Sequence, residues 1–205
     1  MIVLYERTDC PFCWKVRIAL AALGVPYQSV GIELGVKHEQ LVKYSPTGTV
    51  PVMQDGDVAI WESGVMLDYL ERCYGPGRLV PTDPAEAARA WSLHAYCDKV
   101  IGPALKGLVF EKRSRPEVEW DLDLIGESAE KWRDCQAWLE ASVGEWTLDD
   151  NALNVGECAL AARLGVAEVY DAGVTSEFPA LEAWYGRLTE QPFWKAAYPA
   201  SFIGK

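Results

Sequence analysis

Residues 2–24 read IVLYERTDCPFCWKVRIALAALG. The short apolar run from Ile2 to Tyr5 is typical of a β-strand. The stretch from Pro11 to Leu23 predicts a helix, because its apolar residues recur at helical spacing and Gly24 supplies a stop signal. The two cysteines of this stretch therefore lie where a strand passes into a helix.

The position of Cys10 predicts a reactive thiol. Pro11 suits the first helical position, where a missing N–H costs nothing, so Cys10 is expected at the N-cap. Unpaired backbone N–H groups and the positive end of the helix dipole stabilise a thiolate there and lower its pKa. Cys13 follows one turn later, close enough to close a disulfide with Cys10. Such a Cys-x-x-Cys pair in a cytosolic βαβ setting is typical of a thioredoxin-like redox motif.

Two other interpretations of the pair stay open. A zinc site would need further ligands, and the chain offers only His38 and His94 besides distant cysteines, so no metal is expected. An inert structural pair is the second alternative, although the junction of strand and helix favours reactivity. The other cysteines are expected to be thiols that pack as small apolar groups: Cys73, Cys97, Cys135 and Cys158.

The rest of the first eighty residues continues the alternation of strands and helices. The predicted elements are strands at 27–32, 50–53 and 58–61, and helices at 37–44 and from Glu62 to near Gly75. Asp55-Gly56-Asp57 between the last two strands is a hairpin signal. The order of these elements predicts a small α/β domain at residues 1–78.

The second half of the chain contains no convincing strand. Helices are predicted at 85–110, with a bend at Gly102-Pro103, then at 116–142, from Asn154 onward, and at 179–188. Asn154 and Glu157 have the spacing of a capping box. Residues 79–84 read as a linker, so we expect an all-helical domain at residues 85–205.

Two further segments suggest a binding site for a short peptide. A proline after Val50, at the start of a strand, cannot donate to a sheet, and we expect Pro51 to follow a cis bond that frees Val50 to pair with an extended peptide. A simple trans turn is the alternative. Ser63 can cap the next helix, whose N-terminus binds carboxylates, and Glu62 can receive an ammonium group. Together they fit the head of an α-amino acid.

The charge of the chain narrows the function. The 205 residues carry a formal net charge of -11, which argues against general binding to nucleic acid or to anionic membranes. No apolar stretch approaches the roughly 18 residues of a membrane span, and the N-terminus lacks the pattern of a signal peptide, so a cytoplasmic protein is expected. Residues 1–80 hold seven basic and nine acidic residues, so the acidity belongs mainly to the helical half.

Three motifs, in this order and spacing, resemble the cytosolic glutathione transferase superfamily over almost the whole chain. They are CPFC at residues 10–13, SPTGTVPV at 45–52 and ESGVMLDYL at 62–70. The sequences NVGE at 154–157 and ALEAW at 180–184 resemble motifs of the family's helical domain, with Glu157 where the family usually has aspartate. Cysteine at position 10 resembles the omega-like and glutaredoxin-like classes. The resemblance implies a thioredoxin-like, glutathione-binding first domain and an all-helical second domain.

The resemblance also implies a role for each matched residue. Cys10 is the expected nucleophile, and Cys13 is a possible resolving thiol. The expected glutathione-binding residues are Phe12, Lys37, Val50, Pro51, Glu62 and Ser63. Lys37 would lie near the glycine carboxylate, with His38 as a second candidate there. The implied protein is a homodimer that needs glutathione as cosubstrate, uses no metal, and binds neither nucleic acid nor a membrane.

The expected reaction is thiol–disulfide exchange with a glutathione mixed disulfide, with dehydroascorbate reduction as a related possibility. A transferase or isomerase that conjugates glutathione to small electrophiles is one rival. A non-catalytic binding or regulatory protein on the same fold is the other. The second substrate is expected between the domains, opposite Cys10. Aromatic and polar groups available from nearby elements are Tyr5, Trp14, Trp91, His94, Tyr96 and Lys99, although Trp14 also suits the core.

Overall fold

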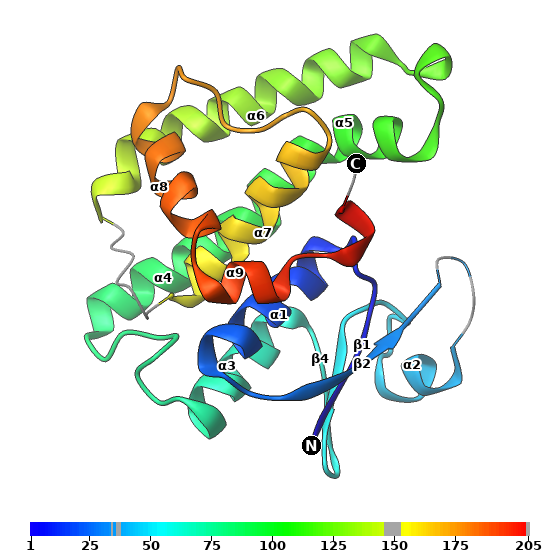
Figure 1. The fold of residues 1–205 in the computed structure, drawn as a ribbon, viewed down its shortest axis with the longest axis vertical. Helices are drawn as coiled ribbons and strands as arrows, with labels where there is room; N and C mark the ends of the chain where they lie inside the picture. The colour runs from blue at the N-terminus through cyan, green and yellow to red at the C-terminus, as the bar shows by residue number, and fades with distance from the viewer. Residues whose placement is uncertain (34, 36–37, 146–152, 204–205) are drawn as a thin grey trace.

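The computed structural model describes residues 1–33, 35, 38–145 and 153–203. A four-stranded sheet with flanking helices occupies the N-terminal part, and the rest of the described chain is helical (Figure 1). The predicted fold class, an α/β thioredoxin-like part followed by an all-helical part, is confirmed. The proposed boundaries at residues 78 and 85 stay a prediction.

The sheet has the strand order β2-β1-β3-β4. β1 runs parallel to β2 and antiparallel to β3, and β3 pairs with β4 in an antiparallel hairpin. The bounds are β1 Ile2–Glu6, α1 Pro11–Leu23, β2 Tyr27–Gly31, α2 Glu39–Tyr44, β3 Val52–Asp55, β4 Val58–Trp61 and α3 Ser63–Tyr74. Each predicted element of this half is present, within a few residues of its expected bounds.

Alternation along the strands gives the sheet two buried faces. Ile2, Leu4 and Met53 belong to the main core, which also contains buried residues of α1 and α3. Tyr5 and Val52 point to the other face, where a small second cluster includes residues of α2. The central strand β1 therefore packs against a hydrophobic cluster on each face of the sheet, and these contacts fix the position of its C-terminal end.

The helical half begins with a long, interrupted helix. α4 spans Pro84–Tyr96, a π-helical turn spans Cys97–Ile101, and α5 spans Gly102–Ser114. The predicted helix is therefore interrupted just before Gly102-Pro103, where a bend was expected. The other helices are α6 Leu122–Ser142, α7 Val155–Val169, α8 Pro179–Thr189 and α9 Pro192–Ala197. α6 starts later than predicted because Asp121 caps it, and α9 was not predicted. No helix in the described ranges has the length and apolar character needed to cross a bilayer.

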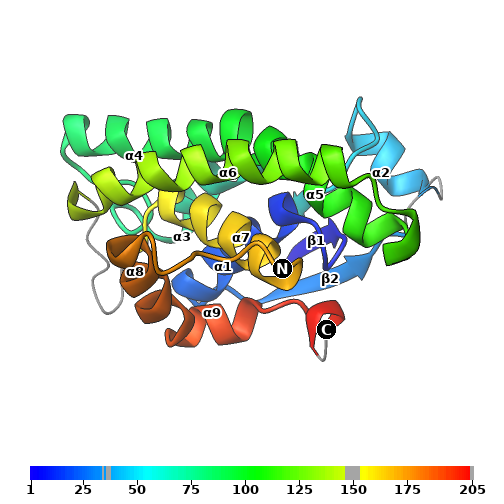
Figure 2. The same ribbon diagram turned by 90° about the horizontal axis from the view of Figure 1, so that it is seen from above.

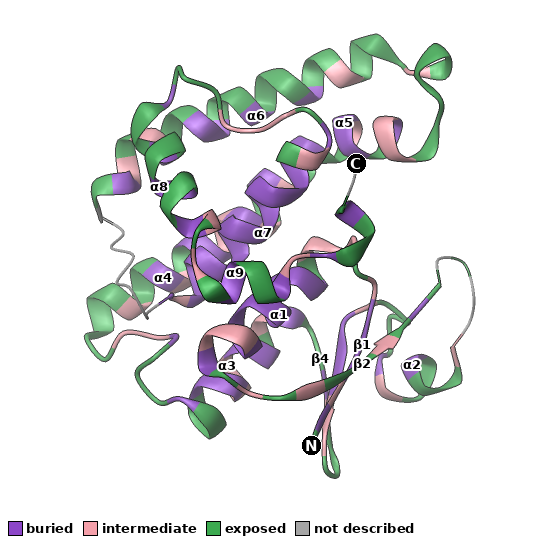
Figure 3. Ribbon diagram, viewed as in Figure 1, coloured by how far each residue is buried: buried purple, intermediate pink, exposed green. Residues whose placement is uncertain are grey.

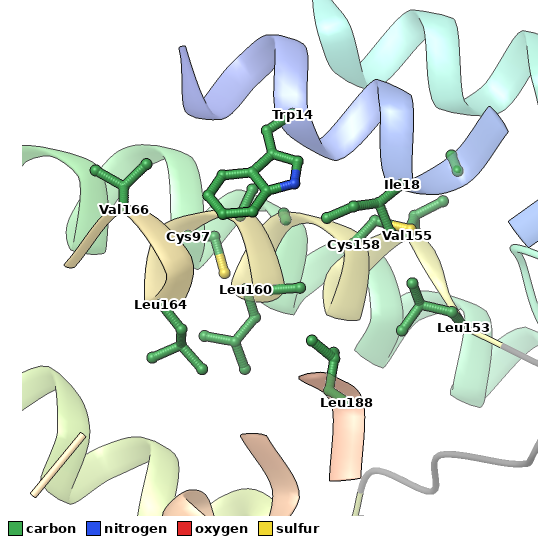
Figure 4. Close-up of a cluster of buried hydrophobic side chains, with 14 of the residues drawn as sticks. Trp14, Ile18, Cys97, Leu153, Val155, Cys158, Leu160, Leu164, Val166 and Leu188 are labelled. Carbon is green, nitrogen blue, oxygen red and sulfur yellow. The ribbon is translucent and has the colours of Figure 1, made fainter. Parts of the chain in front are cut away.

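The helix α7 is the centre of the molecule. All its residues from Val155 to Ala167 are buried, and Figure 3 shows it as the most continuously buried helix. α1 and α7 pack against each other, as seen from a second direction in Figure 2. The indole of Trp14 lies over α7 (Figure 4) and stacks on Trp194, with 4.8 Å between the ring centroids. One continuous core therefore joins the sheet to the helical half.

The cysteines mostly match the prediction. All six are free thiols, and Cys97, Cys135 and Cys158 are buried in the core as expected. The prediction is wrong for Cys73, which is exposed because the last turn of α3 turns this side chain to solvent.

The contact between α1 and α7 generates a first prediction. A Cβ atom added at Gly165 would lie 2.3 Å from the Trp14 ring and 2.7 Å from the Trp194 ring, two rigid groups in a close-packed core. Gly165→Ala should therefore destabilise the protein by about 1–3 kcal/mol, despite the better helix propensity of alanine, measured by denaturant unfolding. Gly126→Ala in α6 is the control, because nothing lies within 4 Å of the new Cβ, and it should be neutral or stabilising. Equal effects of the two variants would contradict the close contact.

The capping box at the start of α7 is present as predicted. The Asn154 side chain accepts hydrogen bonds from the backbone N–H groups of Gly156 and Glu157, and Glu157 accepts one from the Asn154 N–H at 2.9 Å. Burial raises the pKa of Glu157 to about 7, which the hydrogen bond from Asn154 only partly offsets. Its Oε1 atom is buried without a hydrogen-bond partner, as suits a protonated carboxyl.

The raised pKa of Glu157 makes stability depend on pH. In the unfolded chain this carboxyl loses its proton near pH 4.5, whereas in the folded protein it does so only near pH 7. Between these values the folded state binds the extra proton, so the Glu157 contribution falls by about 3 kcal/mol as pH rises through this window. Glu157→Gln should remove that loss, measured as the difference in unfolding free energy between the two proteins at each pH. A constant difference from pH 4.5 to 7 would contradict the assignment.

Candidate active site

Cys10 lies at the start of α1, as the sequence predicts. It is the N-cap residue with extended backbone angles, Pro11 is the first helical residue, and the Cys10 carbonyl accepts the first helical hydrogen bond, from Trp14 N–H at 2.9 Å. The thiol is partly exposed, whereas Cys13 is buried. Of the two cysteines, Cys10 is therefore the more accessible one.

The two thiols have opposite acidities. A hydrogen bond from the Cys13 side chain is the main cause that lowers the pKa of Cys10 to about 7. The backbone N–H groups of Cys13 and Phe12 and the charge of Arg163 act in the same direction, against partial burial. Burial and the neighbouring Cys10 raise the pKa of Cys13. At neutral pH a substantial fraction of Cys10, about half, is therefore thiolate while Cys13 keeps its proton.

The loop before Cys10 is fixed by a buried ion pair. The guanidinium of Arg17 hydrogen-bonds the Glu6 carboxylate, and both side chains are almost fully buried. The same guanidinium donates to the Thr8 carbonyl at 2.8 Å and to the Ala197 carbonyl at 3.2 Å. This arrangement ties the loop to both α1 and α9, so the thiol position is set by rigid elements.

The strand register gathers the predicted binding segments at one end of the sheet. Tyr5 pairs with Val52, and Val52 pairs with Trp61. The residues that follow β1, precede β3 and follow β4 therefore leave the sheet at the same end. These three segments contain Cys10, Val50-Pro51 and Glu62-Ser63 respectively. The Val50–Pro51 bond is cis, as predicted.

The start of α3 corrects one detail of the sequence analysis. Glu62, not Ser63, is the N-cap residue, and its side chain makes no capping hydrogen bond. Glu62 has a φ of 72°, a conformation that is rare for a residue with a Cβ and that clusters at functional sites. Because the N-cap side chain does not occupy them, the first N–H groups of α3 can receive an anionic group.

A cavity of about 540 Å³ opens beside Cys10. Residues of the thiol loop, of α5 and of α7 line it: Arg7, Asp9, Cys10, Pro11, Phe12, Val50, Asp98, Gly102, Pro103, Leu105, Lys106, Val109, Phe110, Arg113, Arg163, Val166 and Tyr170. It lies between the sheet part and the helical part, where the second substrate was expected, and its size suits a small-molecule ligand.

A buried polar cluster lies behind the start of α1. The Lys15 ammonium donates to Asp98 at 2.6 Å and lies 2.9 Å from His94 Nε2. Burial and the nearby Lys15 charge lower the pKa of His94 to about 4, so the imidazole is neutral and accepts this hydrogen bond. Burial raises the pKa of Asp98, but the cations Lys15 and Arg163 more than offset this and lower it overall. Arg163 pairs with Asp98 at 3.3 Å and lies 4.5 Å from the centroid of the Phe12 ring.

Some predicted site residues fall outside the cavity. Cys10, Phe12 and Val50 line it, whereas Pro51, Glu62 and Ser63 do not. Lys37 lies outside the described residues. His38, the second candidate for the glycine carboxylate, is half-buried, lies 5.7 Å from the Tyr5 ring between centroids, and has a buried Nδ1 with no hydrogen-bond partner in the described part of the chain.

The aromatic and polar groups that the sequence analysis listed as available for a second-substrate pocket lie elsewhere. The cavity is lined by none of Tyr5, Trp14, Trp91, His94, Tyr96 and Lys99. Trp14 is fully buried in the core, as its helical spacing also allowed. The sequence analysis missed Arg163 and the α5 residues. The sequence could have pointed to Arg163, because it is the one basic residue in the largely apolar sequence of α7, but nothing in the sequence singled out Arg113.

In the described part of the chain, no group of three or more His, Cys, Asp or Glu side chains could hold a metal ion.

Comparisons with known proteins agree with this geometry. Residues 4–78 match the family model described as "Glutathione S-transferase, N-terminal domain". Glutathione S-transferase GstB of Escherichia coli (strain K12) is 30% identical over 94% of this chain and 95% of that protein. Glutathione S-transferase omega-1 of Sus scrofa is 34% identical over 43% of this chain and 37% of its own length. A theta class glutathione S-transferase from Xanthomonas axonopodis pv. citri, solved with glutathione bound, has a TM-score of 0.83 and 23% identity over 96% of each chain.

The acidity of Cys10 can be measured directly. The rate of alkylation of Cys10 by iodoacetamide, followed by mass spectrometry, should rise with pH around a midpoint near 7. Cys13→Ser replaces the hydrogen-bonding thiol and should change that midpoint, whereas Cys73→Ser, which removes the exposed thiol of α3, should not. A midpoint for Cys10 at the value of an ordinary free thiol would contradict the stabilised thiolate.

Proposed function

Because the chain belongs to the glutathione S-transferase family, we propose that it is a glutathione-dependent thiol transferase with Cys10 as its nucleophile. The observation that carries this proposal is the Cys10 thiol itself. It is partly exposed at a helix N-terminus, its pKa is about 7, and it lies in the wall of the cavity. A thiolate that exists at neutral pH and can be reached by a substrate is the requirement for thiol–disulfide exchange.

Glutathione would bind across the end of the sheet. The backbone of Val50 would pair with its central cysteine next to Cys10, and Phe12 and Pro51 would contact the tripeptide. The first N–H groups of α3, with Ser63, would receive the γ-glutamyl carboxylate, and Glu62 the ammonium group. Lys37, assigned only by its position in the sequence, would lie near the glycine carboxylate. The common end of β1, β3 and β4 supports this placement.

The reaction proceeds in two exchanges. In the first, the Cys10 thiolate attacks the glutathione sulfur of a mixed disulfide, the S–S bond breaks, and the other thiol leaves with the electron pair as a thiolate that takes a proton from water. In the second, the thiolate of another glutathione attacks the sulfur of the bound glutathione. Oxidised glutathione leaves, and Cys10 is again a thiolate. In sum, the mixed disulfide is reduced to a free thiol and glutathione, and one incoming glutathione thiol is oxidised as it joins the glutathione sulfur that was already in the disulfide.

Cys13 has a supporting role in this scheme. Its raised pKa keeps it protonated at neutral pH, so it is a poor nucleophile for resolving the mixed disulfide. Its hydrogen bond stabilises the Cys10 thiolate instead. We therefore favour a second glutathione as the resolving thiol. Dehydroascorbate reduction would use the same Cys10 and is a related candidate activity.

Conjugation of glutathione to a small electrophile is the second candidate function. The size of the cavity and its apolar residues from α5 favour it, since such a pocket can hold an electrophile next to the glutathione sulfur. In that case the attacking thiolate would be that of glutathione, and Cys10 would not form a covalent bond. A substrate panel with aryl halides and glutathione mixed disulfides separates the two functions.

We also propose that the protein works as a cytoplasmic homodimer, as the resemblance implies. Apolar side chains at the edge of the sheet and on α3 support an interface there, since Val58, Trp61 and Val65 are all exposed. Light scattering of the purified protein would measure its mass in solution.

The proposed function makes a sharp prediction for the two cysteines. Cys10→Ser should lower the reduction of a glutathione mixed disulfide by roughly a thousandfold or more, because the attacking sulfur is gone. Cys13→Ser should keep turnover, with an altered pH profile, if Cys13 only tunes Cys10. The assay follows the formation of oxidised glutathione.

Cys73→Ser is the matched control and should behave as the wild type, because Cys73 lies on the surface of α3. Retention of all variants on immobilised glutathione shows that the binding site is intact. Undiminished activity of Cys10→Ser would sink the proposed nucleophile. Failure of the wild type to bind glutathione at all would favour a non-catalytic protein on this fold.

A further inference from the structure

The wall of the cavity carries an excess of positive charge. Its lining contains the cationic residues Arg7, Lys106, Arg113 and Arg163, and only two anionic residues, Asp9 and Asp98. This composition is the reverse of the whole chain, whose formal net charge is -11. An ordinary stretch of the surface of this acidic protein would be anionic. The cationic lining of the cavity therefore differs from what the overall charge predicts.

The two carboxylates do not neutralise the cations around them. Asp9 is shared between Arg7, at 2.8 Å, and Arg113, at 3.5 Å. Asp98 is shared in the same way between the buried Lys15 at 2.6 Å and Arg163 at 3.3 Å. Each carboxylate faces two cations, so each group keeps about one unit of positive charge. These charges lie in a partly enclosed place, where they are screened less than on the surface.

The two arginines are also held in position. Arg163 lies 4.5 Å from the centroid of the ring of Phe12, two residues after Cys10 in the sequence. Arg113 lies 5.5 Å from the centroid of the Phe110 ring. A guanidinium packed against an aromatic ring still has N–H groups at its edge that can bind a carboxylate or sulfonate. The remaining wall is apolar and includes Leu105, Val109 and Val166.

We propose that the second substrate is an organic anion: an apolar body about the size of one ring that carries a carboxylate or sulfonate group. Its apolar part would lie along α5, and Arg113 and Arg163 would bind the anionic group. This inference rests on the proposed function for the reaction at Cys10, and it adds the class of substrate. In the first exchange described above, the thiol released from the mixed disulfide would be a compound that also carries a carboxylate or sulfonate group.

A pair of matched probes tests the preference. They are the mixed disulfides of glutathione with para-mercaptobenzoate and with para-thiocresol, which differ in a carboxylate and a methyl group. We expect kcat/KM, normalised to the uncatalysed rate with glutathione, to be roughly tenfold higher for the carboxylate probe, as a charge-assisted contact requires. Arg113→Gln should reduce this ratio severalfold, because it removes one of the two cations proposed to bind the carboxylate.

Arg115→Gln is the matched control, because it removes the same charge two positions along the chain at a residue that does not line the cavity. It should keep the wild-type ratio. Circular dichroism during heating confirms that both variants are folded. Equal normalised kcat/KM for the two probes in the wild type would overturn the inference, and so would an unchanged ratio in Arg113→Gln.

A binding measurement separates the inference from the proposed function. Titration calorimetry would compare para-(methylthio)benzoate with methyl para-tolyl sulfide, neither of which can undergo disulfide exchange. Tighter binding of the benzoate, weakened by Arg113→Gln, supports the anionic substrate even if neither disulfide is turned over, in which case only the proposed function fails. Equal binding of the two sulfides, together with turnover of both disulfides, leaves the function standing and rejects the inference.

Discussion

The packing of Trp14 against Gly165 is the constraint on which the rest of the structure depends. The indole occupies the space that a side chain at position 165 of α7 would need, and a Cβ added there would lie 2.3 Å from the ring. This contact brings α1 close to the central helix of the other half. Because Cys10 begins α1, the same contact decides that the thiol faces α5 and α7. The cavity beside Cys10 is thus a consequence of how the two halves join.

A second link between the halves is polar and buried. Lys15 comes from α1, His94 from α4, Asp98 from the π-helical turn and Arg163 from α7. Burying charges is costly unless their partners are well placed, so this cluster tolerates few alternative arrangements. The Gly64 residue of α3 also lies against it, because a Cβ there would be 3.0 Å from His94. The start of α1, the start of α3 and the wall of the cavity therefore all contact this one buried polar cluster.

The sequence predicts the sheet half of the fold and the start of α7 well, because the signals for these parts are local. Strand alternation, the N-cap position of Cys10, the proline at residue 51 and the capping box of α7 each depend on a few neighbouring residues. The cavity could not be predicted in the same way. Its wall comes from helices distant in the sequence, and helical spacing does not tell whether Trp14 faces a core or a pocket. The short helix α9 and the shared position of Asp98 likewise depend on tertiary contacts.

The contrast between the acidic exterior and the cationic recess also has a kinetic consequence. A chain with a net charge of -11 repels an anion at long range, whereas the arginines beside Cys10 attract it only at short range. Salt weakens both fields. The rate at which an anionic ligand arrives should then increase with ionic strength, while the time that it stays bound decreases. Two opposing salt effects on one ligand would follow from where the charges lie, and the protein would admit anions slowly but retain those that reach the arginines.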